Sequence, residues 1–348
     1  MKKILFVVSL LILPLNVFSI SASSMVVMDT DNLRVLNGYN QNDSRLIASI
    51  TKIMTAIVAI ENANIEDTVK VTDKVKESFG SGIYIKVGEE IKLKDLLYGL
   101  MLRSGNDAAL MIAEYVGGGV DNFVYMMNEY ANNLKMTNTV FINPHGLEDK
   151  FGNGNKSSSY DMALLTSYAI KNPTFRSIFK TKNYKCESSM MTYVWHNKNK
   201  LLKYDFVTGG KTGFTKKARR TLVTTGSKNN INIVVVTLND PDDFSDHTTL
   251  YNKVFNEYKS YNILDKDKFK IKKEKYYKKH KLYIKNDYNM TLKKSERKDV
   301  LIKIELIKYK HFNNDDIVGY ANIYLKDNLY HKEPIYVKKY VDKSKGRK

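Results

Sequence analysis

The chain has 348 residues, a formal net charge of +19 and one cysteine, Cys186. This length allows two domains, because globular domains usually hold about 100–200 residues. The single cysteine excludes an intramolecular disulfide and zinc sites built on paired cysteines. Most of the positive charge is at the carboxyl end, where Lys259–Lys348 holds 26 Lys and Arg against 12 Asp and Glu.

Residues 1–22 have the pattern of a signal peptide. Two lysines precede an apolar run over residues 4–18, and small residues follow, with Ser21 or Ala22 as the last residue before a cleavage point. The apolar run is shorter than the roughly 20 residues of a membrane span, and it contains Pro14. We therefore predict an exported protein whose signal is removed, rather than one held by an uncleaved anchor.

The chain that follows changes from strand to helix patterns. The segment "MVVMDTDNLRVLNGYN" predicts two short strands around a turn at Asp29–Asn32. From Ile50 the apolar residues recur at helical spacing, which predicts a packed helix. The region from about Thr72 to Asn172 is mostly helical in pattern, so we expect a helical block there.

Strand patterns return at Val207. The segments "TGGKTGF", "RTLVTTGS" and "INIVVVTL" predict three strands, with a hairpin at Lys228–Asn230 between the last two. Helical periodicity then runs from Phe244 to Tyr258. Strands, a helical insert, more strands and a closing helix indicate an α/β layer domain over residues 23–262.

A different domain is expected over residues 263–348. "VLIKIELIKY" alternates Val300, Ile302, Ile304 and Leu306 on one face, and two more strand-like segments follow, which predicts a small all-β domain, resembling a β-sandwich. Its lysine-rich stretch "KFKIKKEKYYKKHKLY" would suggest nucleic acid in a cytosolic protein, but export argues against that partner. Two interpretations stay open: a solvated basic face, or attraction to an anionic envelope surface.

Several familiar catalytic motifs are missing or broken. The sequence contains no H-E-x-x-H and no G-x-S-x-G, so zinc-protease and α/β-hydrolase interpretations lose their markers. "GGKT" at Gly209–Thr212 imitates the end of a phosphate-binding loop, but Asp205 stands where the first glycine is required.

The segment "LIASITKIMTAIVAIE" places Ser49 and Lys52 three residues apart in a helical pattern. A serine hydroxyl needs a base to become a nucleophile, and positions i and i+3 share one face of a helix. Burial and a second nearby cation would lower the pKa of Lys52 toward working pH. The pair is weak evidence alone, because S-x-x-K also occurs at Ser177 and Ser295.

Order and context strengthen this pair. "LRSGNDAA" follows it at an expected helix-to-helix loop, and K-T-G occurs once, at Lys211–Gly213 on an expected strand. S-x-x-K, S-x-N and K-T-G in this order are typical of penicillin-binding proteins and class A β-lactamases. With "MDTDN", "LYGLMLRSGNDAALMIAEYVGG", "FINPHGLED" and "TGGKTGFT", the chain resembles the low-molecular-mass penicillin-binding proteins that act as serine D-alanyl-D-alanine carboxypeptidases. The fold implied is a β-lactamase/transpeptidase-like domain, an antiparallel sheet with helices and a helical subdomain, followed by the small β domain.

The resemblance implies an acyl-enzyme mechanism on peptidoglycan stem pentapeptides. Ser49 would attack the carbonyl between the two terminal D-alanines, Lys52 would be the general base, and Ser104 would relay a proton to the leaving amine. The backbone N–H groups of Ser49 and Phe214 would form the oxyanion hole. β-Lactam antibiotics would be covalent inhibitors, and no cofactor or metal is implied.

The resemblance also implies a set of substrate-binding residues. Asn106 would hydrogen-bond the peptide backbone and help to hold Lys52. Lys211 and Thr212 would bind the terminal carboxylate of the substrate, and Lys211 would also depress the pKa of Lys52. A side chain at Gly213 would obstruct a substrate strand lying alongside.

Three features depart from the family pattern. Arg219–Arg220 stand where a glycine usually follows "KTGFTKKA", and Asn239 stands where a glycine usually follows "VVVTL". The end "YVDKSKGRK" lacks the apolar face of a membrane-docking helix, so no such anchor is expected. We expect the first two departures to affect specificity before activity.

Two other functions compete with a secreted DD-carboxypeptidase. A β-lactamase shares the nucleophile but deacylates with an additional glutamate-held water, and the segment before K-T-G offers only Glu187 for that role, in no recognisable motif. A β-lactamase would also lack the β domain. A non-catalytic penicillin-recognising or envelope-binding protein would use the basic β domain, but it would have no need of the proton-transfer residues.

Overall fold

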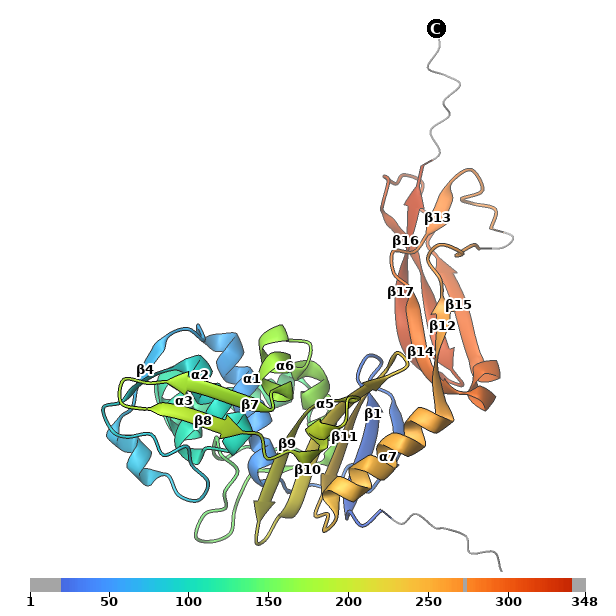
Figure 1. Cartoon of the computed structure of the whole chain (residues 1–348). Helices are drawn as coiled ribbons and strands as arrows, with labels where there is room; N and C mark the ends of the chain where they lie inside the picture. Colours follow the sequence, from blue (N-terminus) through green and yellow to red (C-terminus); the bar gives the residue numbers. More distant parts are fainter. Residues whose placement is uncertain (1–19, 272–273, 340–348) are drawn as a thin grey trace, which may run out of the picture.

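The computed structural model describes residues 20–271 and 274–339. Figure 1 shows a first domain of sheet and helices, with a separate sheet-rich domain above the end of helix α7 (Asp243–Glu257). Residues 1–19 of the predicted signal peptide lie outside the described residues. The carboxyl-terminal segment at residues 340–348, for which no membrane-docking helix is expected, also lies outside them. Among the residues described, no helix has the length and apolar character needed to cross a bilayer.

A five-stranded antiparallel sheet organises the first domain. The strand order is β2-β1-β11-β10-β9, so β9 and β2 are the two edges. The Asn229–Asn230 turn has positive φ at both residues, 53° and 60°, which is the geometry that a two-residue hairpin between β10 and β11 requires. The strands are β1 Ser24–Asp29, β2 Val35–Tyr39, β9 Val207–Thr215, β10 Arg219–Lys228 and β11 Ile231–Leu238.

Helices cover both faces of this sheet. Residues 26, 28, 234 and 236 pack into the core shared with α1 and α5, while residues 27, 233 and 235 pack against α7. This period-2 division is the reason that β1 and β11 read as continuous apolar runs. The helices are α1 Lys52–Asn62, α2 Leu93–Tyr98, α3 Asn106–Gly117, α4 Val120–Asn133, α5 Ser159–Ala169, α6 Pro173–Lys180 and α7 Asp243–Glu257.

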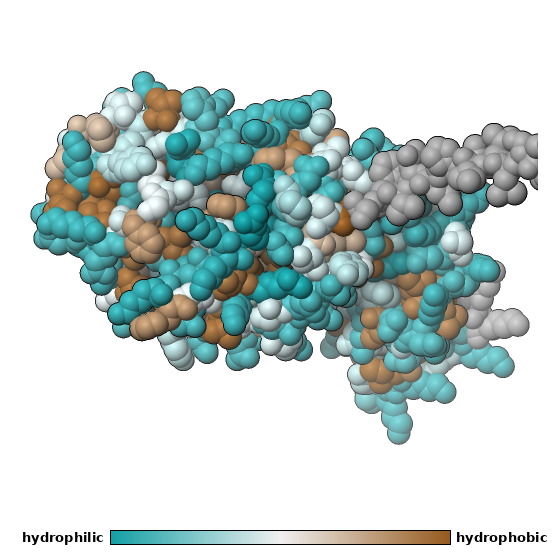
Figure 2. Space-filling view, turned by 90° about the horizontal axis from the view of Figure 1, so that it is seen from below, coloured by the Kyte–Doolittle hydropathy of each residue, from teal (hydrophilic) through white to brown (hydrophobic). Residues whose placement is uncertain are grey.

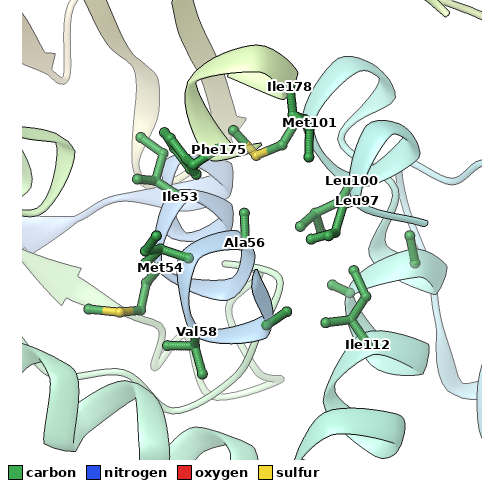
Figure 3. Packing of buried hydrophobic residues seen from close by; sticks show 14 of the residues in the cluster. Ile53, Met54, Ala56, Val58, Leu97, Leu100, Met101, Ile112, Phe175 and Ile178 are labelled. Atoms are coloured by element: carbon green, nitrogen blue, oxygen red, sulfur yellow. The ribbon is translucent and has the colours of Figure 1, made fainter. Parts of the chain in front are cut away.

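Helix α1 is the centre of the larger core. The sequence predicted an apolar stripe, but every residue from Lys52 to Ala59 is buried, so the helix is enclosed on all sides. Burying side chains around the whole helix fixes the position of its first turn. Figure 3 shows the packing of α1 residues Ile53, Met54, Ala56 and Val58 with Leu97, Leu100, Met101, Ile112, Phe175 and Ile178.

Three short antiparallel pairs complete the first domain. The β3–β6 pair connects segments that are distant in sequence, whereas β7 and β8 form a hairpin that lies beside the helical block in Figure 1. The pairs are β3 Arg45–Leu46 with β6 Lys156–Ser157, β4 Thr68–Lys70 with β5 Glu90–Lys92, and β7 Asn183–Glu187 with β8 Thr192–His196.

The carboxyl-terminal domain is all β among the described residues, apart from one 3₁₀ turn at Lys294–Asp299. A four-stranded sheet, β13-β17-β16-β15, and the pair β12-β14 enclose their own apolar core. The strands are β12 Tyr258–Leu264, β13 Lys281–Tyr283, β14 Tyr288–Lys293, β15 Val300–Leu306, β16 Ile317–Leu325 and β17 Asn328–Lys338.

The β15 strand forms where the alternating pattern predicted it, but its apolar face is not fully covered. Ile302 and Ile304 are 39% and 37% exposed. The reason is position, because β15 is the outer strand of its sheet. On the face of the whole molecule in Figure 2, apolar residues form separate small groups among hydrophilic ones.

Contacts cross both of the predicted domain limits. Ser21 donates its backbone N–H to Asp246 (2.6 Å) and its hydroxyl to Asp240 (2.8 Å), and Ala22 is 5% exposed. Strand β12 begins at Tyr258, before residue 262, and pairs with β14 of the carboxyl-terminal domain.

The two domains are joined by polar contacts around one arginine. Arg34, 7% exposed and located in the turn between β1 and β2, forms an ion pair with Glu296 and donates to the carbonyl of Thr291. Tyr258 donates its hydroxyl to the carbonyl of Leu36 on β2, at 2.8 Å. The carboxyl-terminal domain is therefore attached at the β1–β2 edge of the sheet.

Candidate active site

The serine and lysine of S-x-x-K meet at the start of α1. Ser49 lies in a 3₁₀ turn over Ala48–Thr51, and Lys52 is the first residue of α1. The Lys52 Nζ lies 3.1 Å from the Ser49 Oγ, so the predicted i,i+3 contact is formed. Ser49 is partly exposed, whereas Lys52 is fully buried. The turn thus presents a hydroxyl to solvent with an amine behind it.

The surroundings of Lys52 favour a neutral amine. Burial, and then the charges of Lys211 and Lys198, hold the pKa of Lys52 well below its usual value of 10.5. Its Nζ lies 2.7 Å from the Asn106 Oδ1 and 2.6 Å from the His145 carbonyl, and both of these atoms only accept hydrogen bonds. A neutral amine has two N–H groups for these acceptors, and its lone pair is left for the Ser49 proton.

Asn106 is oriented by a second hydrogen bond. Its Nδ2 donates to the carbonyl of Phe79 at 2.6 Å, which turns the Oδ1 toward Lys52. Asn106 is also the first residue of α3 and is 2% exposed. The loop around Phe79 therefore positions the amide that holds the lysine.

Ser104 and Lys211 form the second serine–lysine pair. Ser104 has left-handed backbone angles (φ 66°, ψ 37°) between the π-helical turn Gly99–Arg103 and α3. This conformation costs a non-glycine residue about 1–2 kcal/mol, and it aims the hydroxyl at Lys211, whose Nζ lies 3.0 Å away. Lys211 also donates to the carbonyl of Thr212 at 2.8 Å. Burial, and then the charge of Lys198, lower the pKa of Lys211 to about 7.

Strand β9 brings K-T-G directly against the turn that carries Ser49. A Cβ on Gly213 would lie 2.9 Å from the backbone nitrogen of Ser49 and 2.3 Å from the Thr221 Oγ1. Thr221, on the neighbouring strand, donates to the carbonyl of Ile47 at 2.9 Å and so ties the sheet to the same turn. Phe214 is 59% exposed at this edge of the sheet. The N–H groups of Ser49 and Phe214 stay candidates for an oxyanion hole.

The segment "NPHG" supplies contacts that the sequence analysis did not assign. The carbonyl of His145 accepts from Lys52, and a Cβ on Gly146 (φ +92°) would lie 2.0 Å from the carbonyl oxygen of Ala48. Burial, and then the charge of Lys52, lower the pKa of His145 to about 3, so its ring is neutral. The quoted segment "FINPHGLED" was the only feature of the sequence that could have pointed to this contact, because any residue type can supply a backbone carbonyl.

Two glutamates bear on the β-lactamase alternative. Glu187 is exposed at the end of β7. Glu148 follows "NPHGL", and no sequence pattern indicated a role for it. It accepts a hydrogen bond from the Thr215 hydroxyl on β9. Its carboxylate is thus engaged in holding β9 to the "NPHG" segment.

Two of the residues predicted to be catalytic, Ser49 and Ser104, line a cleft of about 350 Å³. Thr212 and Gly213 come from β9, and basic side chains gather around them. The cleft is lined by Ser49, Ser81, Ser104, Lys198, Lys200, Thr212, Gly213, Phe214, Arg220, Asp243 and Phe244.

Two of the family departures fall where the backbone is left-handed. Arg219 has φ 60° and Asn239 has φ 48°, which are angles that glycine adopts without strain. Asn239 tolerates this conformation well and donates its Nδ2 to the Ser23 hydroxyl at 2.8 Å. Arg219 and Asn239 therefore adopt the backbone conformation that a glycine would favour, although neither is a glycine.

Known proteins resemble this chain over both domains. The D-alanyl-D-alanine carboxypeptidase family of S11 peptidases matches residues 14–242, and the penicillin-binding protein 5 carboxyl-terminal domain matches residues 258–343. The D-alanyl-D-alanine carboxypeptidase DacF of Bacillus subtilis is 35% identical, over 62% of this chain and 56% of its own length. That of Streptomyces sp. K15 is 36% identical, over 61% and 79%. The chain therefore spans little more than half of DacF.

Solved structures extend the likeness to the carboxyl-terminal domain. Penicillin-binding protein 6B of Escherichia coli has a TM-score of 0.70 at 27% identity, covering 91% of this chain and 95% of that one. The fold of penicillin-binding protein 5 of Haemophilus influenzae has a TM-score of 0.74. The predicted transpeptidase-like domain followed by a small β domain is confirmed. With the family match spanning most of the first domain, the chain belongs to the D-alanyl-D-alanine carboxypeptidase family of S11 peptidases.

Proposed function

We propose that this protein is a serine D-alanyl-D-alanine carboxypeptidase that removes the terminal D-alanine from peptidoglycan stem pentapeptides. The observation that carries the proposal is the buried Lys52, whose two acceptors leave its lone pair for Ser49. Family membership supports the same reaction. Penicillins would acylate Ser49 as substrate mimics.

The reaction divides into two steps. Lys52 takes the proton of Ser49 as the Ser49 Oγ forms a bond to the carbonyl carbon of the substrate. The N–H groups of Ser49 and Phe214 hold the resulting oxyanion. Ser104, hydrogen-bonded to Lys211, gives its proton to the departing D-alanine amine as the C–N bond breaks, and the proton that Lys52 took from Ser49 replaces it. Water then attacks the acyl carbon while Lys52 takes a proton from it, the bond between that carbon and the Ser49 Oγ breaks, and Lys52 returns the proton to Ser49.

The position of β9 supports binding of an extended peptide. Its outer edge has no strand partner among the described residues, so a substrate strand can pair with it. The absence of a side chain at Gly213 allows β9 to lie against the Ser49 turn. Export, and attraction of the basic carboxyl-terminal domain to an anionic envelope surface, complete the proposal as inferences from the signal and charge patterns.

The test uses the chain without residues 1–19. It is incubated with a D-Ala-D-Ala pentapeptide and with a fluorescent penicillin, and D-alanine release and covalent labelling are measured. We expect Ser49→Ala to lose both signals and Lys52→Met to slow acylation by about 10²–10⁴-fold. Ser177→Ala is the matched control, because Ser177 is an exposed serine in another S-x-x-K.

Three outcomes would contradict the proposal. The parent protein could release no D-alanine and take no label, which would refute the enzyme assignment. Fast turnover of the penicillin would favour the β-lactamase alternative. An unchanged Ser49→Ala variant would exclude Ser49 as the nucleophile.

A further inference from the structure

One basic side chain in the cleft wall has no role in the reaction described above. Arg220 is the second residue of β10 and lies directly opposite Phe214 on β9. Directly opposite residues of antiparallel strands have side chains on the same face, and Thr212 is the diagonal neighbour on that face. Arg220 lines the same cleft as Ser49 and Thr212.

The guanidinium of Arg220 is held in place from one side. Its Nη2 donates to the Asp243 Oδ1 at 2.7 Å, and its central carbon lies 5.4 Å from the centre of the Phe244 ring. The Asp243 side chain is 3% exposed, whereas that of Arg220 is 42% exposed. Among the described residues, the Arg220 side chain donates to no acceptor other than Asp243. The start of α7 thus fixes one edge of the guanidinium, and the Arg220 Nε is buried without a hydrogen-bond partner. The side chain as a whole still lines the cleft.

Two of the other cations near Ser49, Lys211 and Lys198, are less suited to hold an anionic ligand. Lys211 is 2% exposed and already donates to Ser104 and to the carbonyl of Thr212. Its pKa of about 7 leaves it only partly protonated at neutral pH. Lys198 donates to Ser81 at 3.3 Å, and burial followed by the charge of Arg103 lowers its pKa. An arginine keeps its charge, and its planar N–H groups match a carboxylate.

We propose that Arg220 binds the terminal carboxylate of the peptide substrate beside the Thr212 hydroxyl, and that Asp243 and Phe244 are positioning residues for its guanidinium. This inference rests on the proposed carboxypeptidase function. The family resemblance implied that Lys211 binds the substrate's carboxylate. In the present proposal Arg220 takes that role, and Lys211 holds Ser104 and the Thr212 carbonyl.

The experiment compares two peptides that differ only in the charge at the carboxyl end. One ends in D-Ala-D-Ala with a free carboxylate, and the other is the same peptide with a carboxyl-terminal amide. We measure kcat and KM for both and take the ratio of kcat/KM values as the preference for the carboxylate. Arg220→Gln should lower this preference by about 10- to 100-fold, since it removes a hydrogen bond between charged groups. The rate with the amide should stay within about twofold of the parent.

Matched variants separate a specific contact from the general charge of the cleft. Lys200→Gln removes another cleft cation, and Arg219→Gln removes the neighbouring arginine; both should keep the preference of the parent. Arg220→Lys keeps a charge without the planar fork and should retain an intermediate preference. Asp243→Asn should raise KM for the carboxylate peptide while leaving the amide peptide unchanged, an effect that a merely structural role would not produce.

Each outcome bears on one idea. An unchanged preference in folded Arg220→Gln, or an equal loss in Lys200→Gln, would overturn the inference. If Arg220→Gln did not fold, as judged by circular dichroism, Arg220→Lys would decide, because full preference in that variant would refute the need for the guanidinium fork. A parent that releases no D-alanine would refute the proposed function instead, whereas an active parent with insensitive Arg220 variants would refute only this inference.

Discussion

Replacing Gly213 by alanine tests how closely β9 must approach the nucleophile. The new Cβ would lie 2.9 Å from the backbone nitrogen of Ser49 and 3.1 Å from that of Ile50, while ordinary contacts begin at 3.4 Å. The strand must therefore move away from Ser49 by about 0.5 Å, the difference between 2.9 and 3.4 Å. Thr221, at 2.3 Å from the same Cβ, must also rotate and lose its bond to the carbonyl of Ile47.

These displacements affect both stability and activity. Overpacking costs about 1–3 kcal/mol and the lost hydrogen bond about 1 kcal/mol, so the free energy of unfolding should fall by about 2–4 kcal/mol. A misplacement of 1 Å can cost about 10²-fold in rate, so we expect acylation by a fluorescent penicillin to be about 10- to 100-fold slower. The measurements are urea unfolding and the initial rate of labelling.

A control on the same strand separates the two effects. A Cβ on Gly209 would lie 2.2 Å from a ring carbon of Phe179, away from the nucleophile turn. Gly209→Ala should lose stability but label at a rate near that of the parent. Adding Thr221→Ala to Gly213→Ala should restore part of the stability and leave labelling slow, because the contact with Ser49 persists. Labelling of Gly213→Ala within twofold of the parent, or equal slowing in Gly209→Ala, would refute this reasoning.

Three further predictions concern buried charge, the "NPHG" turn and the contact between the domains. Lys211→Met should abolish turnover yet raise the melting temperature, and the rise should be larger at pH 7 than at pH 10.5. The pKa of Lys211 is about 7 in the folded parent and 10.5 in the unfolded parent, so the unfolded parent binds more protons between these pH values and the parent gains stability as pH rises. Equal melting shifts at both pH values would contradict this. Gly146→Ala should lower the free energy of unfolding by about 3 kcal/mol or more in urea, because its Cβ would collide with the carbonyl of Ala48 at a positive φ; a loss below about 1 kcal/mol would show that the turn can relax. Arg34→Met should cost about 3 kcal/mol by leaving Glu296 unpaired, and calorimetry should then resolve two transitions; a single unshifted transition would show that the ion pair does not couple the domains.

The contacts among the proposed reacting groups could be predicted from sequence, because they depend on residue type and order. Ser49 and Lys52 needed only helical spacing to meet, and the single K-T-G at Lys211 selected this pair among three S-x-x-K matches. The three segments then converge in the structure, because Lys211 is hydrogen-bonded to Ser104 and Lys52 is hydrogen-bonded to Asn106.

Other parts of the site depend on the backbone and on tertiary register. The acceptor role of the His145 carbonyl carries no residue signature, and the left-handed angles of Ser104 are imposed by the turn before α3. Arg220 was noted only as a departure, because its pairing with Asp243 requires the β10 register and the place where α7 begins. The exposure of Ile302 follows from the place of β15 in its sheet, which alternation along one strand does not specify.

The attachment around Arg34 also determines how a mechanical load would enter the molecule. A pull on the carboxyl-terminal domain would reach the first domain along the backbone from β12 into α7, and also through Arg34 and the hydrogen bond from Tyr258 to β2. Both contacts lie at the β1–β2 edge of the sheet, with β11 and β10 between them and β9. A protein tethered through its carboxyl-terminal domain could therefore bear strain at one edge while the strand beside Ser49 stays open to an incoming peptide.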